Sequence, residues 1–279
     1  MPRKILGVIP ARFASTRFPG KVLAQISSKT MLQHVYERCA QARYLTSTTI
    51  ATDDDRVYSV AKGFGAHVRM TRADHPSGTD RVAEVASAET AEIVVNIQGD
   101  EPLIDPAAID AAILPLVHDP EIVMGTLKKR IEDAREITDP NVVKVVTDRS
   151  GDAIYFSRCP IPYVRSTQAR MPVPHGTTQA RMPVPHGSTQ AGNTQARMPV
   201  LRDYFKHVGL YVYRRDFLLQ YSALPVGPLE QAERLEQLRA LENGYKIRVV
   251  ETEYESLGVD TPEDLERVSR LFEASLCGR

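Results

Sequence analysis

The sequence has few cysteines and no long apolar run. Its three cysteines, Cys39, Cys159 and Cys277, lie far apart and form no CxxC pair. An odd number of widely spaced cysteines is typical of free thiols in a reducing compartment and does not indicate a disulfide framework. No stretch approaches the ~20 apolar residues of a membrane span, and the amino-terminal residues do not resemble a signal peptide. We therefore expect a cytoplasmic protein with no membrane partner.

The chain also lacks an excess of either charge. Its 279 residues include 35 Lys and Arg and 35 Asp and Glu, so the formal net charge is zero. General nucleic-acid binders carry a basic excess, so we expect no nucleic acid as a partner. A chain of this length buries roughly 75% of its unfolded surface and needs no structural metal to fold. It is long enough for one large α/β domain or for a domain with a sizeable subdomain.

Strand-like and helix-like segments alternate in the first part of the chain. The spacing of apolar residues predicts strands at 5–9, 48–53, 67–70 and 92–102, and helices at 30–42, 55–65 and 79–89, the last with Thr79 as its N-cap. This rhythm is typical of a three-layer α/β/α, Rossmann-like fold. In such a fold, helices cover both faces of a mostly parallel sheet.

The pattern becomes richer in strands after residue 120. We expect strands at 121–130, 141–148, 151–158, 206–215 and 246–254, and helices at 228–244 and 261–276, the second with Thr261 as its N-cap. We interpret residues 1–120 and 226–279 as a nucleotide-binding α/β core. Residues 121–225 would be a β-rich insertion that carries the second substrate and a subunit contact.

One segment within this insertion is an internal repeat. The 11-residue unit STQARMPVPHG begins at residue 166, recurs with one change at residue 177 and continues in partial copies up to residue 200. Its prolines forbid a continuous helix or a central strand. His175 and His186 could suggest a metal site, but two isolated histidines are weak ligands. We therefore expect residues 166–200 to form a solvated, largely disordered loop.

A basic loop follows the first predicted strand. In PARFASTRFPGK, residues 10–21, three cations stand among small residues: Arg12, Arg17 and Lys21. Such a loop suits a polyanionic ligand better than a core, although these residues alone fit a solvated loop equally well. The loop matches neither GxxxxGK[ST] nor GxGxxG, which argues against a classical ATPase or a dinucleotide-binding protein.

Three more loops should meet the basic loop, because ligands of open α/β sheets sit at the carboxyl ends of the strands. They are residues 53–55, 75–81 and 98–102. The second offers Ser77, Gly78 and Thr79, and the third ends the clearest strand with Asp100 and Glu101. Carboxylates beside phosphates call for a bridging cation, and oxygen ligands favour Mg²⁺. Asp100 could also be a turn residue, so spacing alone predicts only a nucleotide-using α/β enzyme.

Nine segments match the motifs of one enzyme family. They are VIPARFASTRFPGKVL, ATDD, TRADHPSGTDRVAEV, VNIQGDEPLI, NVVKVV, AIYFSR with PIPY, KHVGLYVYRRDFL, PLEQAERLEQLRALENG and GVDTPEDLERV. Together they resemble the 3-deoxy-manno-octulosonate cytidylyltransferases, in order, from residue 5 to about residue 268, except across the repeat. The first motif is shared with other cytidylyltransferases, including the sialic acid enzymes. The combination of QGDEP, SGTDR and GVDTPEDL is more specific to the 3-deoxy-manno-octulosonate enzymes.

The resemblance implies a nucleotide-diphospho-sugar transferase-like fold and an activity. Enzymes of this family join CTP to the sugar acid Kdo and release pyrophosphate, which gives CMP-Kdo for lipopolysaccharide biosynthesis. CTP and Kdo are thus the implied substrates, Mg²⁺ the implied cofactor and a homodimer the implied assembly. Two alternatives stay open: a cytidylyltransferase for 8-amino-Kdo or a sialic acid, and a non-catalytic nucleotide-binding homologue.

The resemblance also implies a role for individual residues. The expected catalytic residues are Arg12, Arg17 and Lys21 around the triphosphate, and Asp100 and Asp260 as ligands of Mg²⁺. The expected nucleotide contacts are Pro10, Ala11, Arg12, Lys21, Ser77, Gly78, Thr79, Gln98 and Asp100. The expected sugar contacts are Gln98, Arg158, His207, Tyr211 and Glu230, although each of the last three could be an ordinary core or surface residue.

Overall fold

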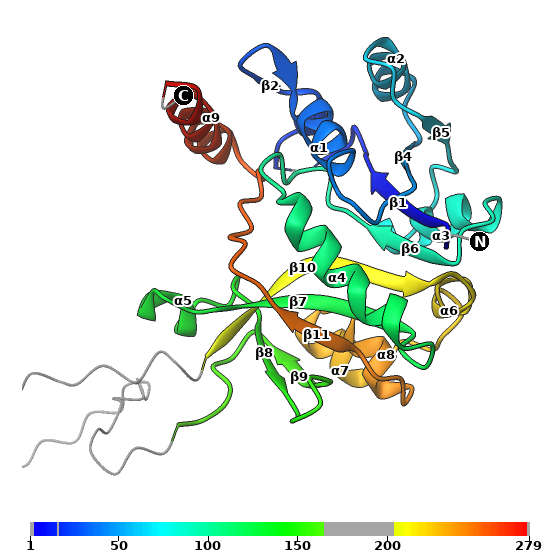
Figure 1. Ribbon diagram of the computed structural model, residues 1–279. Helices are drawn as coiled ribbons and strands as arrows, with labels where there is room; N and C mark the ends of the chain where they lie inside the picture. Colours follow the sequence, from blue (N-terminus) through cyan, green and yellow to red (C-terminus); the bar gives the residue numbers. More distant parts are fainter. Residues whose placement is uncertain (1–2, 16, 165–203, 278–279) are drawn as a thin grey trace, which may run out of the picture.

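A single mixed sheet forms the centre of the protein in the computed structural model, which describes residues 3–15, 17–164 and 204–277 (Figure 1). Its strands are β1 (Ile5–Pro10), β4 (Ser47–Thr52), β5 (Val68–Met70), β6 (Ile93–Asn96), β7 (Met124–Arg130), β8 (Lys144–Thr147), β9 (Ala153–Ser157), β10 (Phe205–Arg214) and β11 (Arg248–Glu251). The order is β11-β7-β10-β6-β1-β4-β5, and β8 and β9 attach beside β10. In the described part of this sheet, the strand pairs that involve β10 or β9 are antiparallel and the others are parallel. The predicted α/β fold with a mostly parallel sheet is confirmed.

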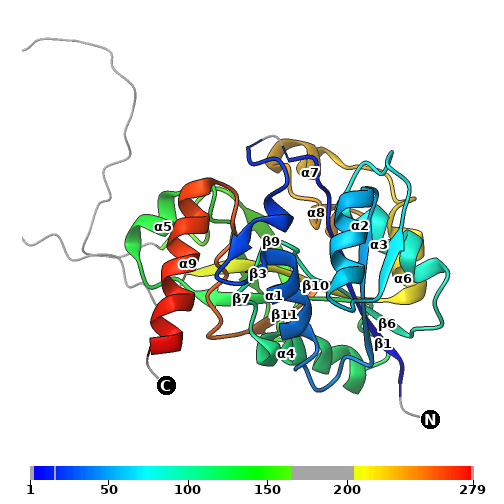
Figure 2. The same cartoon turned by 90° about the horizontal axis from the view of Figure 1, so that it is seen from above.

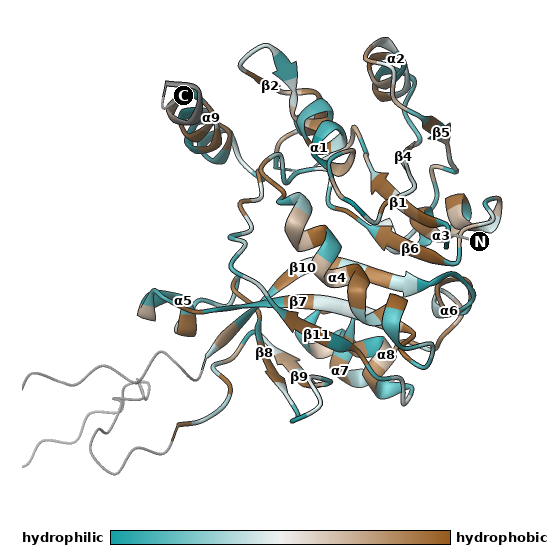
Figure 3. Ribbon diagram, viewed as in Figure 1, coloured by the Kyte–Doolittle hydropathy of each residue, from teal (hydrophilic) through white to brown (hydrophobic). Residues whose placement is uncertain are grey.

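Helices cover both faces of this sheet. The helices of the described chain are α1 (Met31–Cys39), α2 (Asp55–Gly63), α3 (Gly78–Ser87), α4 (Pro106–His118), α5 (Ala134–Thr138), α6 (Arg215–Tyr221), α7 (Pro228–Glu233), α8 (Leu238–Glu242) and α9 (Pro262–Cys277). One core contains residues of α1, α2 and α4, and a second core contains residues of α3, α6 and α8. Because successive side chains of a strand point to opposite faces, β1 contributes Ile5 and Ile9 to the first core and Leu6 and Val8 to the second. Figure 3 shows the resulting apolar strands β1 and β6.

The last helix, α9, lies apart from the two cores. It packs on a small ribbon formed by β2 (Gln25–Ile26) and β3 (Lys29–Thr30) (Figure 2). Ile26, Val259 and Val268 are fully buried in this contact. Thr261 accepts a hydrogen bond from the backbone N–H of Asp264 at 3.2 Å, so its predicted N-cap role is confirmed.

Three local predictions were wrong. The N-cap of α3 is Ser77 and not Thr79: the Ser77 hydroxyl accepts from the Asp80 N–H, and the Asp80 carboxylate accepts from the Ser77 N–H, both at 3.1 Å. The predicted helix 228–244 is broken, because Arg234 adopts a left-handed conformation with φ 52°. The predicted strand 92–102 ends at Asn96. In each case a side-chain contact or a turn overrides the apolar spacing.

Helix α4 was not predicted at all. Its sequence, PAAIDAAILPLVH, is apolar around most of its circumference, so it lacks the amphipathic period of a surface helix. The usable signal was Asp105, which caps the helix, followed by Pro106 at its first position. In the described part of residues 121–225, every strand joins the central sheet. The division into a core and an insertion stays a prediction, and the repeat at 166–200 lies outside the described residues.

The structure describes the side chains of two cysteines. Cys39 is buried and Cys159 exposed, and both are free thiols. Burial raises the pKa of Cys39 to about 12, which makes this thiol unreactive. Among the residues that the structure describes, no helix has the length and apolar character needed to cross a bilayer.

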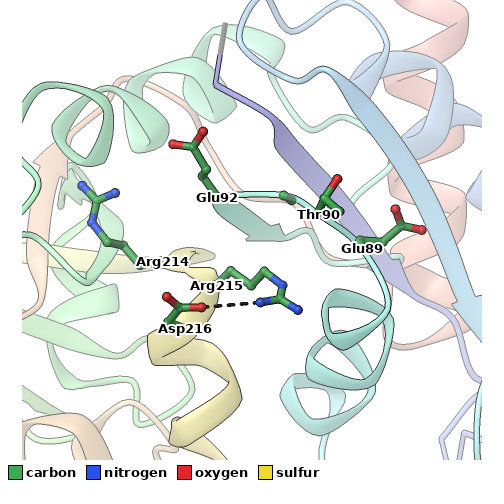
Figure 4. Close-up of a pocket in the computed structure, with 7 residues that line it drawn as sticks. Glu89, Thr90, Glu92, Arg214, Arg215 and Asp216 are labelled. Carbon is green, nitrogen blue, oxygen red and sulfur yellow. Dashed lines mark hydrogen bonds and ion pairs between the residues drawn. The ribbon is translucent and has the colours of Figure 1, made fainter. Parts of the chain in front are cut away.

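Two consecutive arginines join the end of β10 to helices on opposite faces of the sheet. Arg214 donates to the carbonyls of Leu116 at 2.7 Å and Asp119 at 2.9 Å, at the end of α4. Arg215 donates to the carbonyls of Ala86 at 2.9 Å and Ser87 at 3.0 Å, at the end of α3. Both side chains border a cavity of about 420 Å³, and Figure 4 shows them pointing in different directions from it. Their donors satisfy helix-end carbonyls, so this cavity does not present them as free anion ligands.

We expect Arg215→Ala to lower the free energy of unfolding by about 1–3 kcal/mol, because the substitution removes charge-assisted hydrogen bonds from a helix end. Arg215→Lys should restore only part of this loss, since an ammonium cannot reproduce the forked donor geometry. The control is Arg149→Ala at the exposed tip of the β8–β9 hairpin, which should change stability by less than about 0.5 kcal/mol. Equal chemical-denaturation midpoints for Arg215→Ala and the wild type would contradict this bracing role.

Candidate functional site

A cavity of about 470 Å³ opens at the carboxyl ends of β1 and β6. It is lined by Pro10, Arg12, Ala14, Ser15, Arg17, Lys21, Val22, Pro76, Ser77, Gly78, Gln98, Gly99, Asp100 and Asp260. Three of the four predicted loops meet here, together with Asp260 from the start of α9. The loop at 53–55 does not line this cavity.

The basic loop is folded back on itself by a tight turn. The Gly20 N–H donates to the Phe13 carbonyl at 2.8 Å, and Gly20 has a φ of 72°. A Cβ atom at this position would lie 3.0 Å from the Phe13 ring, so both the backbone angle and the space favour glycine. The guanidinium of Arg56 stacks on the Phe13 ring, with its central carbon 3.4 Å from the ring centroid. The turn places Lys21 at the start of a short 3₁₀ helix beside the cavity.

Lys21 holds the two predicted metal ligands together. Its Nζ lies 2.5 Å from Asp100 Oδ2 and 2.7 Å from Asp260 Oδ1. Arg17 contacts the other oxygen of Asp260 at 2.8 Å. Burial lowers the pKa of Lys21, but the charges and hydrogen bonds of both aspartates outweigh burial and hold the pKa above its ordinary value. Lys21 is therefore a permanent cation at neutral pH.

One backbone hydrogen bond and two side-chain hydrogen bonds bring Asp260 to Asp100. The Val259 N–H donates to the Asp100 carbonyl at 2.9 Å. The next residue, Glu101, is buried and accepts hydrogen bonds from the Tyr254 hydroxyl at 2.9 Å and the Ser256 hydroxyl at 2.7 Å. Burial raises the pKa of Glu101, against the effect of these two hydrogen bonds. The sequence showed Glu101 beside Asp100, but only the structure shows that it points inward and anchors the chain that carries Asp260.

Arg12 connects the basic loop to the loop before α3. Its guanidinium donates to the carbonyls of His75 at 2.7 Å and Ser77 at 3.2 Å. Ser77 and Gly78 form the cavity wall at the amino-terminal end of α3, where N–H groups and the helix dipole favour an anion. Thr79 is buried and faces Asn96, whose side-chain amide lies 3.5 Å from its hydroxyl.

Gln98 connects the cavity to β10, the strand that carries two of the predicted sugar contacts, His207 and Tyr211. Its amide donates to the Gly209 carbonyl at 3.2 Å, at an irregularity in the pairing of β10 with β7. The rings of His207 and Tyr211 are 5.3 Å apart on the same strand. His207 also lies 2.9 Å from the Thr126 hydroxyl. Neither ring lines the cavity.

The remaining predicted sugar contacts are engaged with other parts of the chain. Arg158 donates to the carbonyls of Glu233 and Pro140, each at 2.8 Å. Glu230 is buried and forms a bidentate ion pair with Arg239, at 2.6 and 2.9 Å. Neither residue lines the cavity, and Ala11 is a buried residue that does not line it either. The sugar-binding roles of these residues stay predictions.

The donor set of the cavity fits a partly hydrated divalent cation. Within the described ranges, no cluster of three or more His, Cys, Asp and Glu side chains could hold a metal by itself. Mg²⁺ usually takes only one or two carboxylates and completes its shell with water and substrate phosphates. Asp100 and Asp260 already share one cation, Lys21, so their oxygens face a common point.

A family model described as cytidylyltransferase matches residues 6–247. A 3-deoxy-manno-octulosonate cytidylyltransferase from Solibacter usitatus is 74% identical over 99% of this chain and 97% of its own length. The enzyme of that name from Syntrophotalea carbinolica is 55% identical over 95% of this chain and 96% of its own length. The chain belongs to the 3-deoxy-manno-octulosonate cytidylyltransferase family.

A solved structure agrees with this assignment. The structure of CMP:2-keto-3-deoxy-manno-octonic acid synthetase complexed with CTP matches with a TM-score of 0.82 and 41% identity, and the match covers 98% of this chain and 99% of that one. The family resemblance inferred from the nine motifs is confirmed. The nucleotide-diphospho-sugar transferase-like fold inferred with it is confirmed as well.

We expect Glu101→Ala to destabilise the protein by about 2–4 kcal/mol, because it leaves the Tyr254 and Ser256 hydroxyls without an acceptor. The Val259 N–H should also exchange faster with solvent, since the segment before Asp260 loses its anchor. Glu101→Gln keeps an acceptor, so it should lower stability less and accelerate Val259 N–H exchange less than Glu101→Ala. Glu253→Ala, an exposed position on the same segment, is the matched control. Unchanged Val259 exchange in Glu101→Ala would contradict the anchoring role.

His207 should make the protein less stable in mild acid. Burial lowers its pKa from 6.5 to about 3, so below pH 6.5 the unfolded chain binds a proton that the folded chain does not. Stability should fall with decreasing pH across this window, by up to about 1.4 kcal/mol per pH unit from this group. His207→Gln should reduce the slope between pH 6.5 and 5.5, whereas His67→Gln at an exposed position should not. Identical slopes for all three proteins would contradict this assignment.

Proposed function

We propose that the protein transfers the CMP group of CTP to the 2-hydroxyl of Kdo, with release of pyrophosphate and with Mg²⁺ as cofactor. The product would be the activated sugar for lipopolysaccharide biosynthesis. The observation that carries this proposal is the meeting of three cations from one loop with two carboxylates from distant segments in one cavity. The names of the relatives and the CTP complex of the similar solved structure support the choice of substrates.

The triphosphate of CTP would lie along the basic loop. Lys21 is deep in the cavity with 13% of its side chain exposed, whereas Arg17 is 67% exposed at the mouth. Arg12 is fixed by its two carbonyl contacts and would present its remaining donors beside Ser77 and Gly78. These groups would bind the negative phosphates, and the helix end at Ser77 would add backbone N–H donors.

The reaction needs no nucleophile from the protein. The 2-hydroxyl of the sugar gives up its proton to solvent and its oxygen forms a bond to the α-phosphorus. The bond from this phosphorus to the bridging oxygen of pyrophosphate breaks in line with it, and its electron pair leaves with pyrophosphate. The protein contributes by holding both substrates in this alignment and by stabilising the charge that moves onto pyrophosphate. Arg17 and Lys21 are placed for the second task. Mg²⁺ held by Asp100 and Asp260 would supply further neutralisation of the phosphate oxygens.

The sugar would lie between the cavity and β10. Gln98 is the residue that spans the two, because it lines the cavity and contacts the Gly209 carbonyl. We assign the sugar hydroxyls to His207, Tyr211 and Glu230, and the sugar carboxylate to Arg158. This assignment requires Arg158 to exchange its carbonyl partners for the carboxylate, which an arginine binds in a bidentate manner.

We also propose that the protein works as a homodimer in the cytoplasm. The support for a dimer is the family resemblance together with large apolar side chains exposed on and after β9. Ile154 is 61% exposed and Tyr163 is 85% exposed. An edge strand with exposed apolar residues is a common element of subunit contacts.

A pyrophosphate-release assay tests the proposed function. With CTP and Mg²⁺ we expect release that depends on Kdo and that exceeds the rate with 8-amino-Kdo or with N-acetylneuraminic acid. Asp260→Asn, prepared in the same way, is the control for contaminating enzymes and should lose at least about 100-fold, since interactions of this kind in a transition state are worth several kcal/mol. Release with none of the three sugars would favour the non-catalytic alternative, and preference for another sugar would correct the substrate.

A further inference from the structure

The cation that now joins Asp100 and Asp260 belongs to the protein itself. Lys21 Nζ contacts one oxygen of each carboxylate, at 2.5 and 2.7 Å, and Arg17 contacts the second oxygen of Asp260 at 2.8 Å. The two positive and two negative charges compensate each other. Each of the two proposed metal ligands is therefore paired with a cation of the protein.

A divalent cation bound by the same oxygens would compete with this ammonium. Mg²⁺ needs direct contact with carboxylate oxygens, and Lys21 takes one oxygen of each aspartate. A second cation beside an undisplaced ammonium would also be repelled strongly at so short a distance. Metal binding and the present position of Lys21 therefore exclude each other.

We propose that Lys21 is an internal counterion that blocks the metal site until CTP binds. The triphosphate would offer the ammonium a new set of acceptors within the same cavity, and the departure of Lys21 would release Asp100 and Asp260 to the metal. Metal and nucleotide would thus bind together, and free Mg²⁺ would bind weakly to the empty enzyme. This inference rests on the proposed role of the two aspartates as metal ligands.

The arrangement of the cavity allows Lys21 to move while its partners stay. The Lys21 backbone is fixed by the Gly20 turn, but its four-carbon stem is flexible and ends in a compact charge. Asp100 and Asp260 are held by the Val259–Asp100 hydrogen bond, so they do not need to follow. Arg12 cannot act in the same way, because two carbonyls hold its guanidinium.

Binding of Mn²⁺ without nucleotide, followed by electron paramagnetic resonance, tests the proposal. Lys21→Met removes the charge and keeps most of the volume, and it should bind Mn²⁺ at least about tenfold more tightly than the wild type, because two fixed carboxylates then lack a cation. Addition of Asp260→Asn to Lys21→Met should abolish the gain. Lys29→Met, which breaks the surface ion pair with Glu37, is the matched control and should leave the Mn²⁺ affinity unchanged. Equal Mn²⁺ affinity of Lys21→Met and the wild type would overturn the proposal.

Thermal unfolding gives an independent readout. Mg²⁺ without CTP should raise the Tm of Lys21→Met and leave the Tm of the wild type and of Lys29→Met unchanged, since a ligand stabilises only the state that binds it. If Lys21→Met does not fold without metal, Lys21→Gln is used, and recovery of its fold by Mg²⁺ supports the proposal while absence of recovery contradicts it.

Pyrophosphate release by the wild type is a separate measurement. A wild type without activity would refute the proposed function, and a gain of Mn²⁺ affinity confined to Lys21→Met would still support the counterion.

Discussion

The contact of one ammonium with two carboxylates joins three segments that are far apart in the sequence. Lys21 follows β1, Asp100 follows β6 and Asp260 precedes α9. The first two meet because β1 and β6 are parallel neighbours, so their carboxyl ends lie at the same edge of the sheet. Asp260 arrives there because Val259 pairs with Asp100 and because buried Glu101 holds the preceding segment. One cluster of charges therefore joins the sheet, the last helix and the cavity.

The two ends of the proposed substrate pair meet different kinds of protein surface. At the nucleotide end, Lys21 and Arg17 are paired with side chains that a triphosphate and a metal can replace. At the sugar end, Glu230 is fixed by Arg239 and Arg158 is fixed by backbone carbonyls. The nucleotide end thus consists of exchangeable ion pairs, whereas the sugar end is braced by contacts within the chain.

Part of this site could be predicted from the sequence by elementary reasoning. The basic loop after a buried strand and Asp100 after the clearest strand both follow from strand spacing and from the position of ligands in α/β sheets. Asp260 could not be found in this way, because its approach to Asp100 depends on an extended segment with no regular pattern. It entered the prediction only through the family resemblance.

The errors of prediction have physical causes that spacing does not encode. The break at Arg234 coincides with the hydrogen bonds that Arg158 makes to the neighbouring carbonyls, so a tertiary contact overrides a continuous helical pattern. Helix α4 buries one face, but its sequence is apolar around most of its circumference and therefore has no amphipathic period. The inward direction of Glu101 depends on Tyr254 and Ser256, which are more than 150 residues away in the chain.

Crystals grown with CTP and Mn²⁺, with the metal located by its anomalous scattering, would test the shared site most directly. The account predicts a manganese ion in contact with a carboxylate oxygen of both Asp100 and Asp260, and Lys21 turned from these oxygens to a phosphate oxygen of CTP. A manganese ion held by the phosphates alone, with Lys21 still between the two aspartates, would contradict it.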